Sequence, residues 1–360
     1  MKWHSAWLIM ALECLVCVPT HALLYSLTDL GTLGGVSSQA FGINDSGQIV
    51  GASVTSGGQT HAFIYSGGVM TDMGTLGGNN SQALGINASG EVVGVADLSS
   101  NSHAFSYTTA GGMVDLGTLG GFNSQANAIN NSGVITGYSS VASGHTHAFS
   151  YNGTMTDLGT MGGSLDSTAY GINNSGVIVG QSNNHMFSYS GGVYTDLGNL
   201  PGQAYAGASD INSAGEIVGA SQAPSSSDHA VSYTTAGGMV DLGTIGGGTI
   251  STAKGINDLG DIVGDSQNAS GQNMAFIYDG GVMYDLTSLL DSSGAGWVLT
   301  APSTAAGGIN DLGQIVGTGT DPLGQLHAYL LTPVPEPTSM ALLVGGAGAL
   351  GVTLYRRRRS

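Results

Sequence analysis

Histidine and aspartate recur in this chain at a spacing that would place them opposite each other across a hairpin. Six of the nine histidines begin the tripeptide "HAF" or a variant of it, and a "DLG"-type group lies on the next expected strand. Such a pair could act as a general base held by a carboxylate. Because no serine, threonine or cysteine nucleophile interrupts the repeated pattern, we interpret the pair as a hydrogen bond of the scaffold. The predicted pairs include His61 with Asp72, His103 with Asp115, and His147 with Asp157.

The aspartates of these groups could instead bind calcium, which prefers oxygen ligands. The chain has no dense "DxDxDG" pattern of a calcium-binding loop. We therefore expect the aspartates to cap turns and predict no cofactor, with calcium as the alternative. The glycine-rich "GTLGG" segments lack the lysine and the following helix of a phosphate-binding loop. The series consists of Asp29, Asp72, Asp115, Asp157, Asp196, Asp241 and Asp285.

Variable polar loops and one aromatic insertion are the places where ligand specificity is expected. Segments such as "ADLSSNS" and "SQAPSSSDH" precede the "HAF" groups, and loops on a rigid scaffold are common binding elements. Trp297 lies in an insertion of the last unit. Its side chain is a candidate ligand contact that could stack on a sugar ring. We expect instead that it is buried and fills the closing unit.

Three markers recur in fixed order, seven times each, and define a repeat. They are the "DLG" group, the dipeptide Ile-Asn and the "HAF" group. Successive Ile-Asn asparagines are 43, 43, 43, 39, 45 and 53 residues apart. This length suits four short strands with their turns, which is the unit of a β-propeller blade. The asparagines are Asn44, Asn87, Asn130, Asn173, Asn212, Asn257 and Asn310.

Two recurrent glycines fit this architecture. Each Ile-Asn asparagine is followed three residues later by a glycine, such as Gly47, which suits the first and last positions of a type I turn. A second glycine, represented by Gly51, falls inside an expected strand, where close approach of a neighbouring backbone is the usual reason. We assign both to the scaffold and expect no catalytic role for them.

The two ends of the array complement each other. The first unit begins at "YSLTDLGTLGG" without a preceding "HAF" strand, and the last structural piece is "LHAYLL" without a following "DLG" strand. Pairing of residues 326–331 with residues 25–30 would complete seven blades and remove the open edges of the array. We therefore predict an all-β, seven-bladed propeller over residues 23–333, closed by its terminal strands.

From Tyr25 to Leu331 these units resemble the "HAF" family of bacterial extracellular repeats. The resemblance implies export and repetition, and it supplies no activity. Departures from the pattern are "DLGNLPG" and "HAV" in the fifth unit and "NMAF" in the sixth.

Charge excludes several partners. Of 23 acidic residues, 21 lie in residues 23–333 when Glu13 and Glu336 are set aside, against the single basic residue Lys254. A domain without a basic patch is a poor partner for nucleic acid or anionic lipid. Both cysteines lie in the first 20 residues, so the repeats have no disulfide and no thiolate site.

Both ends of the chain have the composition of protein-targeting signals. Lys2 precedes the apolar stretch "SAWLIMALECLVCVPTHA", which indicates a secretory signal peptide over residues 1–22, with a buried helix as the alternative. Near the other end, residues 337–355 carry no charge and would form a helix of roughly 28 Å, enough to cross a bilayer. The arginines after it are expected to stay on the cytoplasmic side.

The segment 334–360 resembles a PEP-CTERM sorting signal of exported Gram-negative proteins. The resemblance implies recognition by an exosortase-type membrane protease, transient membrane insertion by the helix, removal of the tail and delivery to the cell surface or matrix. A permanent single-pass anchor is the alternative. The residues that carry the resemblance are Val334, Pro335, Glu336, Pro337, Arg356, Arg357, Arg358 and Arg359.

The sequence thus predicts an exported, acidic propeller that acts as a binding or structural module, with exopolysaccharide as a candidate partner, and not as an enzyme. The alternative function is a polysaccharide hydrolase or lyase that uses acidic residues of the central channel. Glu91 and Glu216, in equivalent positions of two units, are the only glutamates between residues 23 and 333. Such an enzyme would need paired carboxylates at a defined separation.

Overall fold

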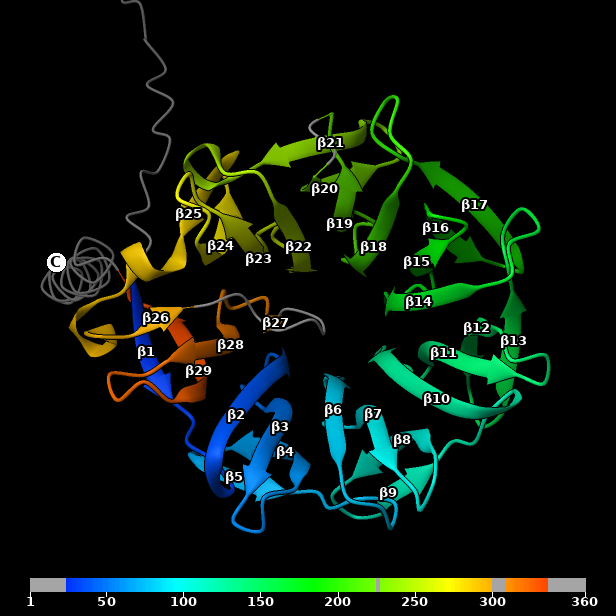
Figure 1. The fold of residues 1–360 in the computed structure, drawn as a ribbon, viewed down its shortest axis with the longest axis horizontal. Coiled ribbons are helices and arrows are strands. Elements are labelled where there is room, and N and C mark those ends of the chain that lie inside the picture. The colour runs from blue at the N-terminus through cyan, green and yellow to red at the C-terminus, as the bar shows by residue number, and fades with distance from the viewer. Residues whose placement is uncertain (1–23, 225–226, 300–307, 336–360) are drawn as a thin grey trace, which may run out of the picture. The chain divides into compact units, whose positions relative to one another are not determined.

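Seven small antiparallel sheets stand around a central axis and form a closed ring (Figure 1). This computed structural model describes residues 24–224, 227–299 and 308–335. Six of the sheets have four strands connected in sequence, and the seventh combines strands from both ends of the ring. The predicted all-β, seven-bladed propeller is confirmed.

Blades 1 to 6 repeat one plan, in which the first strand lines the centre and the fourth lies at the rim (Figure 1). Blades 1 to 3 are β2 (Gly34–Ile43), β3 (Ile49–Thr55), β4 (Thr60–Ser66) and β5 (Val69–Asp72); β6 (Ser81–Ile86), β7 (Val92–Asp97), β8 (Ser102–Thr108) and β9 (Gly112–Asp115); and β10 (Gly120–Ile129), β11 (Ile135–Val141), β12 (Thr146–Tyr151) and β13 (Met155–Gly159).

The next three blades follow the same order. They are β14 (Ser167–Ile172), β15 (Ile178–Ser182), β16 (His185–Ser190) and β17 (Val193–Gly198); β18 (Ala206–Ile211), β19 (Ile217–Gln222), β20 (Asp228–Thr234) and β21 (Gly238–Gly243); and β22 (Ser251–Ile256), β23 (Ile262–Gln267), β24 (Asn273–Asp279) and β25 (Val282–Asp285), with a short 3₁₀ turn, η1 (Ile245–Gly247), before β22.

Blade 7 closes the ring. Its outermost strand is β1 (Tyr25–Asp29), which pairs antiparallel with β29 (Leu326–Pro333) from the other end, as predicted. On its inner side, two short strands, β26 (Val298–Leu299) and β27 (Gly308–Ile309), both pair with β28 (Ile315–Thr320). Two 3₁₀ turns, η2 (Leu286–Leu289) and η3 (Ser292–Gly294), occupy the insertion before them. Within the described residues, the outermost strand of blade 7 is therefore supplied by the opposite end of the propeller sequence.

The hydrophobic core is divided among the junctions between neighbouring blades. Five of the seven "HAF" groups have a phenylalanine at the third position, and each is fully buried, as at Phe63 and Phe149. One cluster joins Phe63 of blade 1 to Val316 and Ala328 of blade 7, so the closing joint has the same apolar packing as the others. Burial of each such aromatic side chain contributes on the order of 2 kcal/mol to the stability of the fold.

In blades 1 to 6 the glycine inside the second strand is explained by backbone approach, as predicted, whereas Gly317 of blade 7 lies against the Tyr329 side chain. A Cβ added to Gly51 would collide with the carbonyl oxygen of Gln39, and one added to Gly137 with that of Gln125. The neighbouring strand lies so close that no side chain fits between them. Only a residue without Cβ allows the first two strands of a blade to pair there.

The seven Ile-Asn asparagines do more than begin the predicted turns. Each is buried, and its Oδ1 accepts backbone N–H groups of its own turn, as Asn44 does from Ser46 and Gln48. Its Nδ2 donates to the backbone carbonyl of the equivalent asparagine in the next blade at 3.0 to 3.3 Å. The last of these bonds runs from Asn310 to Asn44, so the hydrogen bonds form a closed circle.

A buried serine also links neighbouring blades. Ser81 accepts a hydrogen bond from the Ala62 amide of the preceding blade and donates one to the Gly74 carbonyl. The same bond closes the ring, because the Ala328 amide of blade 7 donates to Ser38 of blade 1 at 2.9 Å. Buried polar groups that are paired in this way add specificity to the packing between blades.

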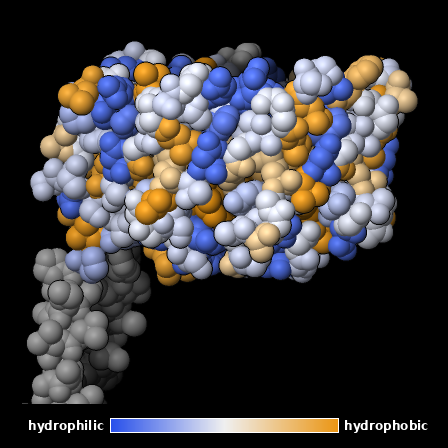
Figure 2. Space-filling view, turned by 90° about the horizontal axis from the view of Figure 1, so that it is seen from below, coloured by the Kyte–Doolittle hydropathy of each residue, from blue (hydrophilic) through white to orange (hydrophobic). Residues whose placement is uncertain are grey.

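The surface seen from the side has polar and apolar residues interspersed (Figure 2). In the described residues, no helix is long and apolar enough to span a bilayer. The signal peptide predicted over residues 1–22, the helix over residues 337–355 and the terminal arginines lie outside the described part of the chain. Residues Tyr25–Pro333 form one compact unit.

Candidate functional site

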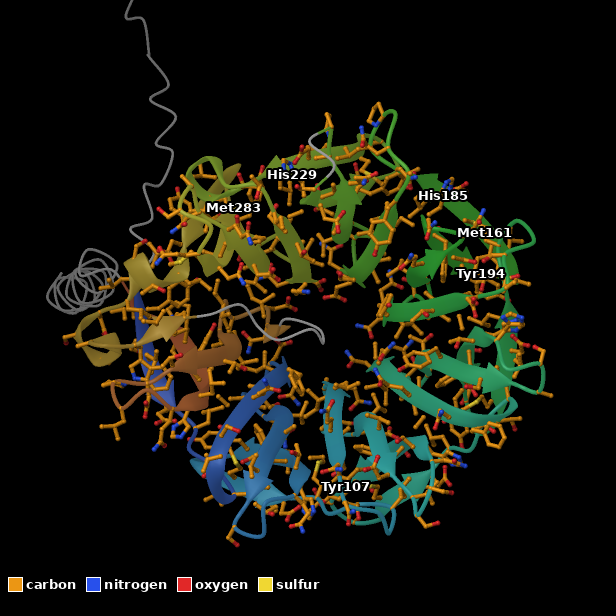
Figure 3. The ribbon with its side chains drawn as sticks, viewed as in Figure 1. Tyr107, Met161, His185, Tyr194, His229 and Met283 are labelled. Atoms are coloured by element: carbon orange, nitrogen blue, oxygen red, sulfur yellow. The ribbon has the colours of Figure 1, made fainter. Side chains whose placement is uncertain are left out.

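The predicted His–Asp pairs are present at the outer half of the blades. His61, His103 and His147 each place Nδ1 2.8 to 2.9 Å from a carboxylate oxygen of Asp72, Asp115 and Asp157, respectively. Three more pairs have the same geometry, at 2.8 to 3.0 Å: His185 with Asp196, His229 with Asp241, and His327 with Asp29. His185 and His229 lie away from the centre of the ring (Figure 3).

These pairs connect the third and fourth strands of a blade. Each aspartate also accepts the amide of the glycine two residues later, as Asp72 does from Gly74 at 2.7 Å. The carboxylate therefore orients both the imidazole and the turn that leads to the next blade. In blade 6, Met274 replaces the histidine, and Asp285 instead caps η2 through the Thr287 amide. This arrangement agrees with a scaffold role better than with a proton-transfer site.

Trp297 is enclosed. Only 8% of its surface is exposed, and its ring lies against Gly319 of β28, so that a Cβ at this glycine would come within 3.1 Å of it. The residue fills space in the closing blade and presents no open face on which a sugar could stack. We therefore do not expect Trp297 to contact a ligand.

A concave pocket lies in the central channel instead, among the inner strands of blades 2 to 6. Its volume is about 220 Å³. Pockets of this kind combine aromatic or apolar walls with a few placed polar groups. The lining consists of Leu84, Gln125, Asn127, Tyr170, Gln181, Tyr205, Gly207, Ala208, Ser209, Ala220, Thr252 and Lys254.

The pocket is lined by the position of the repeat that varies most. The innermost strand has the pattern "SQAxGI", and its fourth residue changes from blade to blade while its neighbours stay nearly constant. This residue is Phe41, Leu84, Asn127, Tyr170, Ser209 and Lys254 in blades 1 to 6. Residues that repeat in every blade maintain the fold. The residues that vary and also line a cavity are therefore the candidates for ligand binding. This variation lies within a strand and not in the loops where ligand specificity was expected.

Two tyrosines form the aromatic part of the wall. Tyr170 on β14 exposes 39% of its surface, and Tyr205 precedes β18 in the next blade. The pKa of the Tyr170 phenol is raised by burial and then by the nearby Tyr205 and Tyr138. Both phenols thus stay neutral and can donate or accept hydrogen bonds at any physiological pH. Neighbouring aromatic faces with polar tips suit a ligand that is apolar on one face and hydroxylated at its edge.

Side-chain amides supply the hydrogen-bonding part of the wall. The Tyr138 hydroxyl donates to Gln125, which in turn donates to Asn127 at 2.8 Å. Asn127 donates to the carbonyl of Ala169 in the next blade, and this bond fixes its orientation. Tyr205 donates weakly to Gln181 at 3.4 Å. These preorganised amides retain free donor and acceptor capacity toward the pocket.

Lys254 is the only lysine or arginine between residues 24 and 335, and it lines this pocket. Its Nζ lies 3.6 Å from Asp265 Oδ1. Burial raises the pKa of Asp265, and the lysine lowers it in part. The lysine charge is therefore balanced by Asp265, and the pocket presents no net positive charge to a ligand.

A second, larger cavity of about 640 Å³ lies between blades 2 and 3. Its lining is polar and includes Asn80, Asp97 and Asn123. Gln125 and Tyr138 link it to the channel, since Gln125 lines both cavities and Tyr138 bonds to Gln125. The two cavities therefore share one wall residue, Gln125.

A separate cavity of about 210 Å³ lies where the seven Ile-Asn turns converge. It includes Asp210, which occupies a position that is glycine in five of the other six blades. Asp210 accepts the amides of Ile211 and Ile256 at 2.8 and 3.2 Å. Burial nevertheless raises its pKa from 3.8 to about 6.

Asp210→Asn is expected to change how stability depends on pH. Because the pKa of this carboxyl is higher in the folded state, its ionisation destabilises the fold: the penalty is absent below pH 3.8 and complete above about pH 6. When the pH is raised from 4 to 7, the free energy of unfolding of the parent protein should fall by roughly 2 kcal/mol relative to that of the variant, allowing for partial solvent screening. Urea denaturation at both pH values measures this, and a difference between the proteins that stays constant with pH would contradict it.

The two glutamates considered for catalysis do not form a pair. Glu91 lies beside Gly133 of blade 3, and Glu216 lies beside Gly260 of blade 6. Burial raises the pKa of Glu91. Each glutamate therefore has its own surroundings at a different turn of the ring.

The C-terminal segment of the chain matches a known family of sorting signals. A family model described as the PEP-CTERM protein-sorting motif matches residues 333–359. The chain carries this sorting motif. The PEP-CTERM resemblance is thereby confirmed, and it implies an exported, surface-sorted protein that is processed by an exosortase. The resemblance of the repeats to the "HAF" family stays a prediction. No protein of curated function matches the chain.

Several solved propellers resemble the ring. The virginiamycin B lyase of Staphylococcus aureus is 12% identical with a TM-score of 0.50, over 86% of this chain and 100% of that one. The putative TolB of Agrobacterium tumefaciens is 14% identical with a TM-score of 0.47, over 87% and 99%. TolB of Acinetobacter baumannii is 11% identical with a TM-score of 0.43, over 84% of this chain and 65% of that one. Such low identity shows the fold alone.

Proposed function

We propose that this exported propeller is a binding module that holds a saccharide in its channel pocket. The observation that carries the proposal is the pocket wall, which combines the tyrosines Tyr170 and Tyr205 with the amides of Gln125, Asn127 and Gln181. A sugar ring has an apolar face and an edge of hydroxyls. Aromatic faces can cover the first, and preorganised amides can bond the second.

Charge favours a neutral saccharide. Residues 23–333 hold 21 acidic groups against Lys254, and that lysine is already paired with Asp265. The field of such a domain repels polyanions. A neutral saccharide is not repelled by this field, and its hydroxyls can bond to Lys254 without disturbing the charge balance of the Lys254–Asp265 pair.

The sorting motif supplies the setting for this binding. A surface-sorted protein meets the polysaccharides that the cell exports, so the ligand is expected among the neutral segments of the producer's own exopolysaccharide. On the same proposal the exosortase removes the tail after transient membrane insertion and releases the ring to the surface or the matrix.

Binding without cleavage is expected. Among the described residues that line the channel pocket, none is an aspartate or a glutamate. Glycosidic hydrolysis needs two carboxyl groups flanking the bond. This composition of the wall favours a binding module over the alternative, a polysaccharide hydrolase or lyase.

The test is to incubate the exported protein with purified exopolysaccharide from the same cells. We expect the protein to sediment with the polymer, soluble neutral oligosaccharide to release it, and no new reducing ends or unsaturated products to form over a day. Release of such products would establish the enzyme instead. Failure to be retained on any neutral polysaccharide would leave a purely structural matrix component.

A further inference from the structure

The closing blade contains a cluster of side chains that the other blades lack. Asp29 on β1, Asp321 after β28 and His327 on β29 each offer one ligand atom, and these atoms lie within 4.8 Å of one another. In the described part of the chain, this is the one such group of three. It joins residues from the two ends of the ring.

The third member, Asp321, distinguishes blade 7. The equivalent residue, two positions after the one that pairs with the histidine or its replacement, is Thr55 in blade 1, Leu98 in blade 2 and Asn268 in blade 6. Asp321 is 7% exposed although it carries a charge. A buried carboxylate is expensive to keep unless a cation or several donors neutralise it.

The turn that Asp321 begins does not require a carboxylate. Its Oδ1 accepts the amides of Leu323 and Gln325 at 2.9 and 2.7 Å. Asn268 makes the same two bonds in blade 6 with a neutral amide, to Ser270 and Gln272. The second oxygen of Asp321 is therefore surplus to the turn, and within the described residues no hydrogen bond is made to it.

We propose that Asp29, Asp321 and His327 bind a first-row divalent transition-metal ion of the Zn²⁺ type. Imidazole nitrogen with two carboxylates is a ligand set for such ions, whereas calcium and magnesium favour oxygen alone. The His327 Nδ1 and the Asp29 Oδ2 are 3.0 Å apart. At a tetrahedral ion with bonds of about 2.1 Å, two ligand atoms lie roughly 3.4 Å apart, so this pair would need to separate by only about 0.4 Å to bind the ion.

The site is open to ions and closed to the core. Asp29 exposes 41% of its side chain and His327 13%, so an ion can enter past Asp29 while Asp321 holds it from below. The negative charge of the domain raises the local concentration of cations. A bound ion would tie β1 to β29 and Asp321, and it would oppose opening of the ring at the joint where the chain ends meet.

The test compares the full exported chain with Asp321→Asn, after removal of metal by a chelator. Because Asn268 supports the same turn, the variant should melt at the same temperature as the parent without metal. Zn²⁺ at about 100-fold over its Kd should raise the Tm of the parent by about 5 °C and leave the variant nearly unchanged. Titration calorimetry should show one tight site in the parent and at least a tenfold weaker one in the variant.

Asp72→Asn is the matched control, because it alters the corresponding pair in blade 1, where Thr55 replaces the third ligand. This variant should keep the full Zn²⁺-induced rise in Tm. An equal rise in the Asp321→Asn variant, no rise in the parent, or an equal rise with Ca²⁺ in the parent would overturn the proposal.

Discussion

Replacing Tyr25 with alanine is expected to lower the free energy of unfolding of the ring by about 4 kcal/mol. Tyr25 begins the closing strand β1 and is 1% exposed. Burial, and then the nearby charges of Asp261 and Asp279, raise the pKa of its phenol, so the side chain is enclosed and lies within electrostatic reach of blade 6. Its loss would leave a cavity at the joint that holds the two ends of the ring together.

Urea denaturation followed by circular dichroism measures this change as a lower midpoint at unchanged slope. Phe122→Ala is the control, since Phe122 is 73% exposed, and its replacement should alter stability by less than about 0.5 kcal/mol. If the two variants lost equally little stability, the closing strand would not be held as the structure shows it.

Replacing either pocket tyrosine with alanine is expected to weaken saccharide binding by about tenfold to a hundredfold, or roughly 1 to 3 kcal/mol. Tyr170 and Tyr205 lie in neighbouring blades and line the same pocket, so the double variant should lose binding almost completely. Tyr170→Phe should lose much less than Tyr170→Ala, because it keeps the aromatic face and removes only the hydroxyl.

The control for this series is Tyr284→Ala. Tyr284 on the outer strand β25 is 37% exposed, close to the 39% of Tyr170, but it does not line the channel pocket. Its replacement should leave the Kd for the oligosaccharide unchanged. Equal losses at Tyr284 and Tyr170 would mean that binding follows exposed tyrosines in general and not the pocket.

The architecture was predictable because repetition makes the same constraint visible seven times. The glycine within each second strand indicated a close backbone, and the structure places the carbonyl of Gln39 against Gly51. The incomplete units at the two ends indicated closure, and β1 pairs with β29. A single copy of either pattern would have been ambiguous.

The contacts between blades were not predictable from local patterns. Asn44 was interpreted as the start of a turn, which it is, but its Nδ2 also reaches the carbonyl of Asn87 in the next blade. Ser81 carried no signal beyond its recurrence, although it bonds to Ala62 and Gly74. Such bonds depend on how far each blade is rotated about the axis, and no spacing along the chain encodes that rotation.

The candidate site was missed for a related reason. Variation was sought in loops, whereas Asn127, Tyr170 and Lys254 vary within a strand that otherwise repeats. Comparing the units position by position would have found them. Their convergence on one pocket follows only from the ring, because they come from blades 3, 4 and 6. Trp297 attracted attention as a rare aromatic and is enclosed.

The central claim, that the channel pocket holds the saccharide, is tested most directly by oxidative footprinting of the exported protein with and without a neutral oligosaccharide of its own exopolysaccharide. We predict that the ligand protects Tyr170 and Tyr205 from hydroxyl-radical modification and leaves the equally exposed Tyr284 as reactive as before. Unchanged reactivity of both pocket tyrosines under saturating ligand, or protection of Tyr284 alone, would contradict the account.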